Sequence, residues 1–193
     1  MADGNDVGTD KQSIYAVMDD LPVGGTTYTR SNLTSRSVGD GTGTDADERY
    51  FQNLTSITNK GWYVDLPGKG ERIVQNAQID GSYLVTASMM PSGDSCADAQ
   101  GSGYVNALSL FPGMLAGGKS YFDRNNDGYT DDSGTSSDSG NKPTGSVKTV
   151  GMPTLPLLLP GEYKCQTSTG ESCEGAKGRP RWNRVSWREL RND

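Results

Sequence analysis

The sequence predicts an all-β protein made of short antiparallel strands joined by long loops. Three observations favour this class: short β-prone runs alternate with turn clusters, 26 of the 193 residues are glycine, and only 32% of the residues are hydrophobic. No segment shows the apolar periodicity of a helix of useful length. The chain is long enough for one domain with a sizeable core.

The expected strands follow from runs of β-branched and aromatic residues bounded by turn residues. In chain order they cover residues 13–18, 54–57, 62–66, 72–79, 82–89 and 104–110, one strand within 147–159, and 183–190, where Val185 and Trp187 share a side. Long loops are expected at about 31–48, which is rich in Gly, Thr and Asp, and at 133–146, which has low complexity.

The clearest element is a pair of hairpins between residues 61 and 91. Residues 67–70 (PGKG) are expected to form the first turn. Asp80 and Gly81 form a second, two-residue turn that suits type I′ geometry. With the strand at 104–110, four antiparallel strands follow one another, which is typical of one β-propeller blade. A β-sandwich would also account for the pattern.

Composition excludes several functions. The chain has no histidine, so it holds no Ser-His-Asp or Cys-His catalytic set and no His-ligated zinc. No nucleophile elbow, P-loop or metallohydrolase motif is present, and we expect no enzymatic activity. The net charge of −6 argues against nucleic acid as a partner. No apolar run is long enough to span a membrane, and no signal peptide is visible.

A calcium-loop pattern begins at Asp123. Oxygen-bearing side chains recur at alternate positions, Asp123, Asn125 and Asp127, and Gly128 follows the third of them. This is the front part of an EF-hand-type loop, in which side chains converge on one hard cation and the glycine permits a sharp bend. The alternative is a solvated acidic turn.

The rest of the loop extends the ligand set. The carbonyl of Tyr129 would be the next ligand, followed by Asp131 directly or through water. Position twelve is Gly134, so the usual bidentate glutamate is absent. The carboxylates repel one another unless a cation neutralises them, and we therefore expect one bound Ca²⁺.

Two of the three cysteines are close in the sequence. Cys165 and Cys173 are eight residues apart in a polar segment and could pair as a small loop staple, which implies an oxidising compartment. Cys96 is left over.

Two further clusters allow competing interpretations. Residues 179–188 mix arginine with tryptophan and could bind single-stranded nucleic acid, but the acidic composition favours a final strand with buried tryptophans. Asp45, Asp47 and Glu48 could form a second cation site, but they lack the alternating spacing with its glycine and are expected in a solvated loop.

An ordered set of short signatures resembles the PilY-type proteins, which are type IV pilus assembly factors and tip adhesins. The signatures occupy residues 12–17 (QSIYAV), 61–67 (GWYVDLP), 70–74 (GERIV), 86–91 (TASMMP), 101–108 (GSGYVNAL), the calcium loop and 186–190 (SWREL). The resemblance covers most of the chain and implies the C-terminal part of a modified β-propeller domain over residues 1–193, as a fragment, split subunit or reduced relative.

The resemblance also implies a function. Asp123, Asn125, Asp127 and Asp131 match the side-chain ligands of the family's calcium loop, and Tyr129 matches its backbone ligand. A PilY-type module would be exported through the periplasm to the cell surface or pilus tip. Its partners would be minor pilins or other pilus subunits, and a host or surface receptor. The alternative is a secreted, calcium-stabilised β domain that binds a partner unrelated to pili.

Overall fold

A computed structural model describes residues 11–18, 28–41, 47–52, 54, 60–91, 101–112, 120–123 and 144–177. In this part of the chain, strands dominate and the only helix is the short 3-10 turn η1 (Arg30–Asn32), which confirms the all-β class. The strands are β1 (Ser13–Val17), β2 (Thr34–Arg36), β3 (Val38–Asp40), β4 (Glu48–Phe51), β5 (Gly61–Asp65), β6 (Gln78–Asp80), β7 (Tyr83–Met90), β8 (Ser102–Ser109), β9 (Phe122–Asp123), β10 (Thr144–Val150), β11 (Leu157–Leu159), β12 (Glu162–Gln166) and β13 (Ser172–Lys177).

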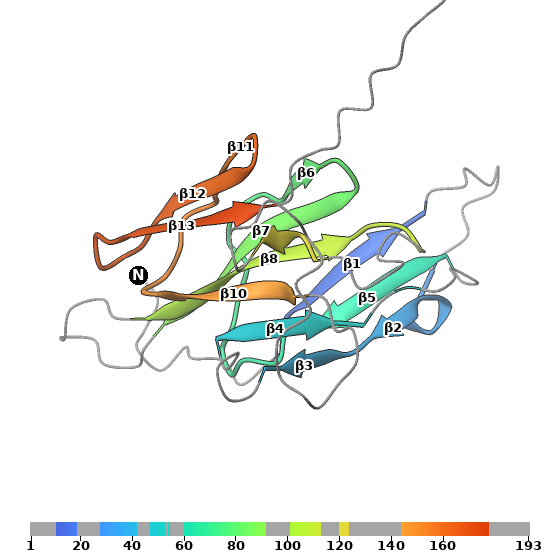
Figure 1. Cartoon of the computed structure of the whole chain (residues 1–193). Helices are drawn as coiled ribbons and strands as arrows, with labels where there is room; N and C mark the ends of the chain where they lie inside the picture. Colours follow the sequence, from blue (N-terminus) through green and yellow to red (C-terminus); the bar gives the residue numbers. More distant parts are fainter. Residues whose placement is uncertain are drawn as a thin grey trace, which may run out of the picture.

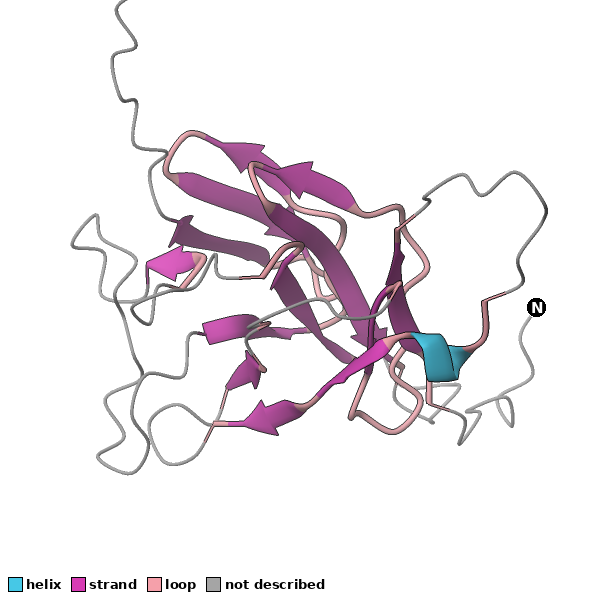
Figure 2. Ribbon diagram, turned by 90° about the vertical axis from the view of Figure 1, so that its right-hand side faces the viewer, coloured by secondary structure: helices cyan, strands magenta, loops and turns pink. Residues whose placement is uncertain are grey.

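The strands form three separate sheets (Figures 1 and 2). The largest has six strands in the order β3-β4-β10-β8-β7-β6, with antiparallel neighbours throughout. A four-stranded antiparallel sheet has the order β11-β12-β13-β9. The third sheet has the order β1-β5-β2, in which β2 runs parallel to β5. No closed propeller is formed by the residues that the structure describes.

The central strands β7 and β8 of the six-stranded sheet are buried on both faces along most of their length. Alternate residues of these strands point to opposite sides and enter two different cores. On one face, Val85 and Val105 pack against Phe122 and Tyr163 of the four-stranded sheet. On the other face, Leu108 packs in a second core with Trp62 and Val64 of the three-stranded sheet. The fold is therefore a three-layer stack with the six-stranded sheet in the middle.

The two predicted hairpins differ from the structure: the first is not formed, and the second has its turn one residue later than predicted. The strand β5 does not pair with the next strand along the chain but with β1, in the register Tyr15 opposite Tyr63. The first hairpin is lost because β5 buries Trp62 and Val64 in the second core. The turn between β6 and β7 consists of Gly81 and Ser82, since Asp80 pairs with Tyr83; Gly81 adopts φ +60°, which favours glycine.

Other element boundaries also differ from the prediction. The expected loop at 31–48 contains β2 and β3 and the first residue of β4. Of the strand expected at 72–79, only residues 78–79 lie in a strand, namely β6, and an isolated bridge joins Arg72 to Met89. Residues 147–159 supply two strands, β10 and β11. Leu54 lies outside any strand, and the segments 55–57, 133–143 and 183–190 lie outside the described residues.

Candidate functional site

The structure places one of the five expected calcium ligands. Asp123 is the last residue of β9 and its side chain is buried. Asn125, Asp127, Tyr129 and Asp131 lie outside the described residues, so the geometry of the ligand set remains a prediction. Among the residues that are described, no three Asp, Glu, Cys or His side chains come together in a way that could hold a metal ion.

The start of the expected loop is firmly anchored. The strand β9 pairs with β13, with Phe122 opposite Lys177 and Asp123 opposite Ala176. The ring of Phe122 is 1% exposed and meets the ring of Tyr163 edge-on at 5.5 Å between centroids. The first ligand therefore leaves the four-stranded sheet from a fixed position.

A polar clamp joins this anchor to the six-stranded sheet. The ammonium group of Lys177 and the hydroxyl of Tyr121 both donate to Oδ2 of Asp80, the latter at 2.6 Å. Burial alone would raise the pKa of the Asp80 carboxyl, but the hydrogen bonds from Lys177 and Tyr121 outweigh burial and lower it below 3.8. Burial and the bond to Asp80 raise the pKa of Tyr121 well above its usual value.

The clamp makes stability depend on pH at the acid end. Because the pKa of Asp80 is lower in the folded than in the unfolded protein, its contribution is complete well above pH 3.8 and is lost as the pH falls through the folded pKa. We expect Asp80→Asn to lower the free energy of unfolding at pH 7 by about 1 to 2 kcal/mol. Urea unfolding at pH 7 and near pH 3 measures this, and the difference from wild type should shrink at the lower pH.

A matched control is Asp47→Asn. Asp47 is mostly exposed and lies 3.4 Å from Lys148, so its removal should change stability little at either pH. An Asp80→Asn deficit that stays constant between the two pH values would contradict the assignment.

The outer face of the four-stranded sheet forms a groove beside Asp123. The groove has a volume of about 600 Å³, and its charged lining residues are Asp123, Glu162, Lys164 and Glu174. Lys164 lies 3.7 Å from Glu162 and is the cross-strand neighbour of Glu174. The groove thus carries more negative than positive side chains where the expected calcium loop begins.

The structure joins Cys165 and Cys173 in a disulfide, as their spacing predicts. The two residues are direct cross-strand neighbours on β12 and β13, with Cα atoms 4.9 Å apart. Both pack against the core between the four- and six-stranded sheets. Cys96 lies outside the described residues.

Loss of this disulfide should destabilise the protein. We expect the double variant Cys165→Ser/Cys173→Ser to lose about 2 to 3 kcal/mol of unfolding free energy in the chain-entropy picture. Chemical denaturation of the oxidised protein, the reduced protein and the variant tests this. The reduced wild type should match the variant; equal stability of oxidised and reduced wild type would exclude a stabilising disulfide.

A buried polar network occupies the other face of the six-stranded sheet. Nη1 of Arg49 donates to both carboxylate oxygens of Glu71, at 2.9 and 2.8 Å, and both side chains are buried. The hydroxyl of Ser88 also donates to Glu71. Asn106 donates to Ser88 at 3.0 Å and accepts from Ser146.

This network brings the sequence signatures together. Glu71, Ser88 and Asn106 come from three of the signatures noted above, at 70–74, 86–91 and 101–108. The guanidinium of Arg49 also lies 3.5 Å from the ring centroid of Tyr104. Sequence reasoning missed the network because its members are spread over separate signatures, and no local spacing shows that these signatures meet in the fold.

A second buried arginine supports the other core. Arg36 donates to the carbonyls of Ser109 and Gln52, at 2.9 and 3.1 Å, and its guanidinium lies 4.6 Å from the ring centroid of Trp62. Burial lowers the pKa of Arg36 to about 10. The indole nitrogen of Trp62 donates to the carbonyl of Leu110 at 3.1 Å.

The alternative sites can be compared with the structure in part. Glu48 is buried in β4, so its assignment to a solvated loop is wrong; Asp47 is mostly exposed and pairs with Lys148. Asp45 and the segment 179–188 lie outside the described residues. No helix in the described residues is long and apolar enough to cross a membrane.

Fold and site together define a three-layer all-β domain with a disulfide-linked hairpin at the base of an expected calcium loop. No protein-family model matches the chain, and no solved structure matches it. The chain is 27% identical over 150 residues to a type IV pilus biogenesis factor PilY1 homolog from Xylella fastidiosa (strain Temecula1). The match covers 74% of this chain and 12% of the relative's length. This similarity indicates a distant PilY-like relationship.

Proposed function

We propose that this chain is a calcium-binding, non-enzymatic module of type IV pilus biogenesis, placed at the cell surface at or near the pilus tip. The observation that carries the proposal is the similarity to the PilY1 homolog over 74% of the chain. The convergence of three signatures in the buried Arg49–Glu71 network supports it, because it gives them a shared structural reason. The disulfide suits export through the periplasm.

The fold proposal is a modified β-propeller. Its support is the order β10-β8-β7-β6, in which four antiparallel neighbours could correspond to one blade. Under this proposal the three-stranded and four-stranded sheets are the modified parts of the architecture.

The proposed mechanism is a conformational bias set by calcium. Calcium would neutralise the carboxylates of Asp123, Asp127 and Asp131 and so order the loop. The loop starts at β9, which the clamp at Asp80 ties to the six-stranded sheet. An ordered loop would therefore fix the surface that meets pilus subunits or a receptor, and loss of the ion would shift the balance of pilus extension and retraction.

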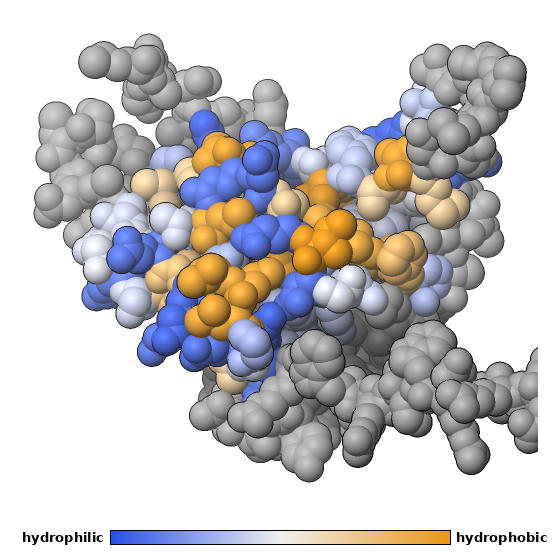
Figure 3. Space-filling view, turned by 90° about the horizontal axis from the view of Figure 1, so that it is seen from above, coloured by the Kyte–Doolittle hydropathy of each residue, from blue (hydrophilic) through white to orange (hydrophobic). Residues whose placement is uncertain are grey.

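A contact surface is available where the two larger sheets meet. The view from above shows hydrophobic residues across this face among hydrophilic ones (Figure 3). Ile79 of β6 and Leu157 of β11 are large exposed hydrophobic residues, and Gln78 donates to the carbonyl of Pro156 at 2.9 Å. Such apolar surface supports a role in protein contact.

Calcium binding is testable on the purified chain. We expect wild type to bind one Ca²⁺ with roughly micromolar or weaker affinity, because the loop lacks a terminal bidentate glutamate. Asp127→Ala should weaken binding at least about tenfold, since it removes a charged ligand. Titration calorimetry measures the affinity. The control is Asp138→Ala, which removes an acidic residue from the segment that follows the loop. Equal calcium binding by wild type and Asp127→Ala would contradict the assignment.

The pilus role is tested in the native strain. Asp127→Ala/Asp131→Ala is preferable to a change at Asp123, because Asp123 is buried in β9 and its loss could unfold the anchor. We expect altered surface piliation and twitching in this strain. Normal piliation, twitching and adhesion, with the protein expressed and free of calcium, would contradict the switch. If deletion of the chain also had no effect, a secreted β domain with an unrelated partner would replace the pilus proposal.

A further inference from the structure

A small pocket lies where the three-stranded sheet meets the six-stranded sheet. Its volume is about 270 Å³, and it is bounded by the start of β1, the strand β7 and the segment 73–77 that leads to β6. Two of its lining residues, Ile14 and Leu84, also pack against the second core. The pocket therefore continues this core toward the surface of the molecule.

The lining of the pocket is mainly apolar and carries no charged side chain among the described residues. Its apolar members are Ile14, Leu66, Ile73, Ala77 and Leu84. A charged group that entered the pocket would leave water without an oppositely charged partner, which is costly. The pocket is therefore suited to an uncharged molecule.

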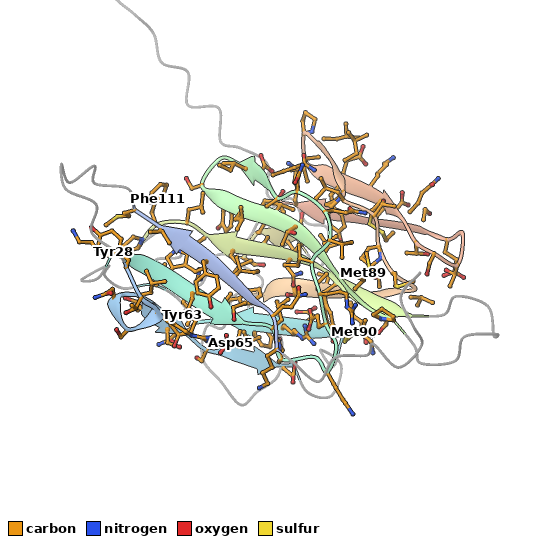
Figure 4. The ribbon with its side chains drawn as sticks, turned by 180° about the vertical axis from the view of Figure 1, so that it is seen from behind. Tyr28, Tyr63, Asp65, Met89, Met90 and Phe111 are labelled. Carbon is orange, nitrogen blue, oxygen red and sulfur yellow. A yellow bond between two sulfur atoms is a disulfide. The ribbon has the colours of Figure 1, made fainter. Side chains whose placement is uncertain are left out.

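Three polar side chains complete the lining, and two of them already have partners. Oε1 of Gln12 accepts from the backbone N–H of Ile73 at 3.1 Å. The hydroxyl of Ser13 donates to Asp65, the last residue of β5 (Figure 4). The third is Thr86, which is 1% exposed and whose hydroxyl has no hydrogen-bond partner among the described residues.

The unpaired hydroxyl of Thr86 differs from the next polar group on the same face of β7. The hydroxyl of Ser88 donates to Glu71 and accepts from Asn106. Buried polar side chains nearly always have such partners, so an unpaired one calls for an explanation. Gln75, in the segment that bounds the pocket, also has a buried side-chain oxygen without a partner in the described part of the chain.

We propose that the pocket binds a small uncharged molecule with an apolar ring or short chain and one hydroxyl group. The apolar part fills the space between Ile14, Ile73 and Leu84, and the hydroxyl group pairs with Thr86. A dry cavity of about 150 Å³ already holds benzene, so the pocket has room for a substituted ring. Water alone is a poorer occupant, because it needs about two to four polar partners. The inference is independent of the proposed pilus role.

The first experiment titrates the full chain with p-cresol and with toluene, which differ by the hydroxyl group alone. The methyl NMR signals of Ile14, Ile73 and Leu84 report binding. We expect wild type to bind p-cresol, and Thr86→Val to weaken p-cresol about five- to tenfold relative to toluene, because it removes one hydrogen bond and keeps the shape of the side chain. No binding of p-cresol by wild type, or an equal effect of Thr86→Val on both probes, overturns the proposal.

The second experiment places the bound probe in the pocket without a change in the core. Ala77 is an exposed residue of the lining, so Ala77→Phe should fold normally, occupy the pocket with its ring and weaken p-cresol binding by about tenfold or more. Val74→Phe is the matched control, because Val74 is 61% exposed in the same segment and does not line the pocket. Equal p-cresol binding by the two variants overturns the assignment of the site.

The charge of the ligand is tested with p-toluate, which replaces the hydroxyl group of p-cresol with a carboxylate. We expect no shift of the same methyl signals, because the lining offers the carboxylate no cationic partner. Binding of p-toluate as tight as that of p-cresol would contradict the uncharged class of ligand.

Discussion

Replacement of Glu71 with alanine is expected to lower the free energy of unfolding by about 3 to 5 kcal/mol, because it leaves a buried charge without its partner. Glu71 is 1% exposed and accepts from Arg49, from Ser88 and from the backbone N–H of Gly68. All of these donors would lose their acceptor at once. Urea or guanidinium unfolding followed by tryptophan fluorescence measures the effect.

Two controls separate the orphaned charge from other causes. Asp40→Ala removes the exposed carboxylate that lies 3.2 Å from the guanidinium of Arg49. It should lower the free energy of unfolding by much less than Glu71→Ala does. The double variant Arg49→Met/Glu71→Leu removes both charges and should be more stable than Glu71→Ala alone. A double variant that is less stable than Glu71→Ala would show that the salt bridge itself, and not the cost of leaving Arg49 unpaired, accounts for most of the lost stability.

Replacement of Trp62 with alanine is expected to cost a similar amount, about 3 to 5 kcal/mol, through a cavity in the second core. Trp62 is 1% exposed and packs with Phe51, Val64 and Leu108. Its loss also removes the ring beside the buried guanidinium of Arg36. Thermal and chemical unfolding measure the change.

The control for this variant lies on the same sheet. Val17→Ala changes an exposed side chain on β1 and should alter the free energy of unfolding by no more than about 0.5 kcal/mol. A loss at Trp62 as small as that at Val17 would contradict the place of Trp62 in the core.

Local sequence patterns predicted the strands better than their partners. The strands β1, β5 and β7 were predicted to within one residue, at 13–18, 62–66 and 82–89, because each run is β-prone and ends at turn residues. The pairing of these strands was not predicted. The strand β5 pairs with β1 and buries Trp62 and Val64 in the second core, and this core forms only in the complete fold. The short strands β2 and β3 were not predicted, because a run of three residues is too short to show the alternation of side chains that marks a strand.

The candidate site was predictable only where spacing is local. The disulfide follows from two cysteines whose separation suits a hairpin. The calcium loop, expected from alternating oxygens with a glycine, stays a prediction, because four of its five ligands lie outside the described residues. The Asp80–Lys177 clamp joins residues 97 positions apart. The Arg49–Glu71 pair has neighbours from three further strands, β3, β7 and β8, and from the loop at Gly68. No local pattern encodes such pairs, because their partners meet only after the sheets have stacked.

The disulfide-linked hairpin has a mechanical consequence. Tension applied to the chain beyond Lys177 would peel β13 from β12 and β9 one residue at a time, beginning at the clamp with Asp80. Peeling can reach Cys173 but cannot pass it, because the covalent bond then transfers the load to Cys165 on β12. The hairpin can therefore lengthen only by the few residues between Cys173 and Lys177 before force acts on the next strand of the sheet.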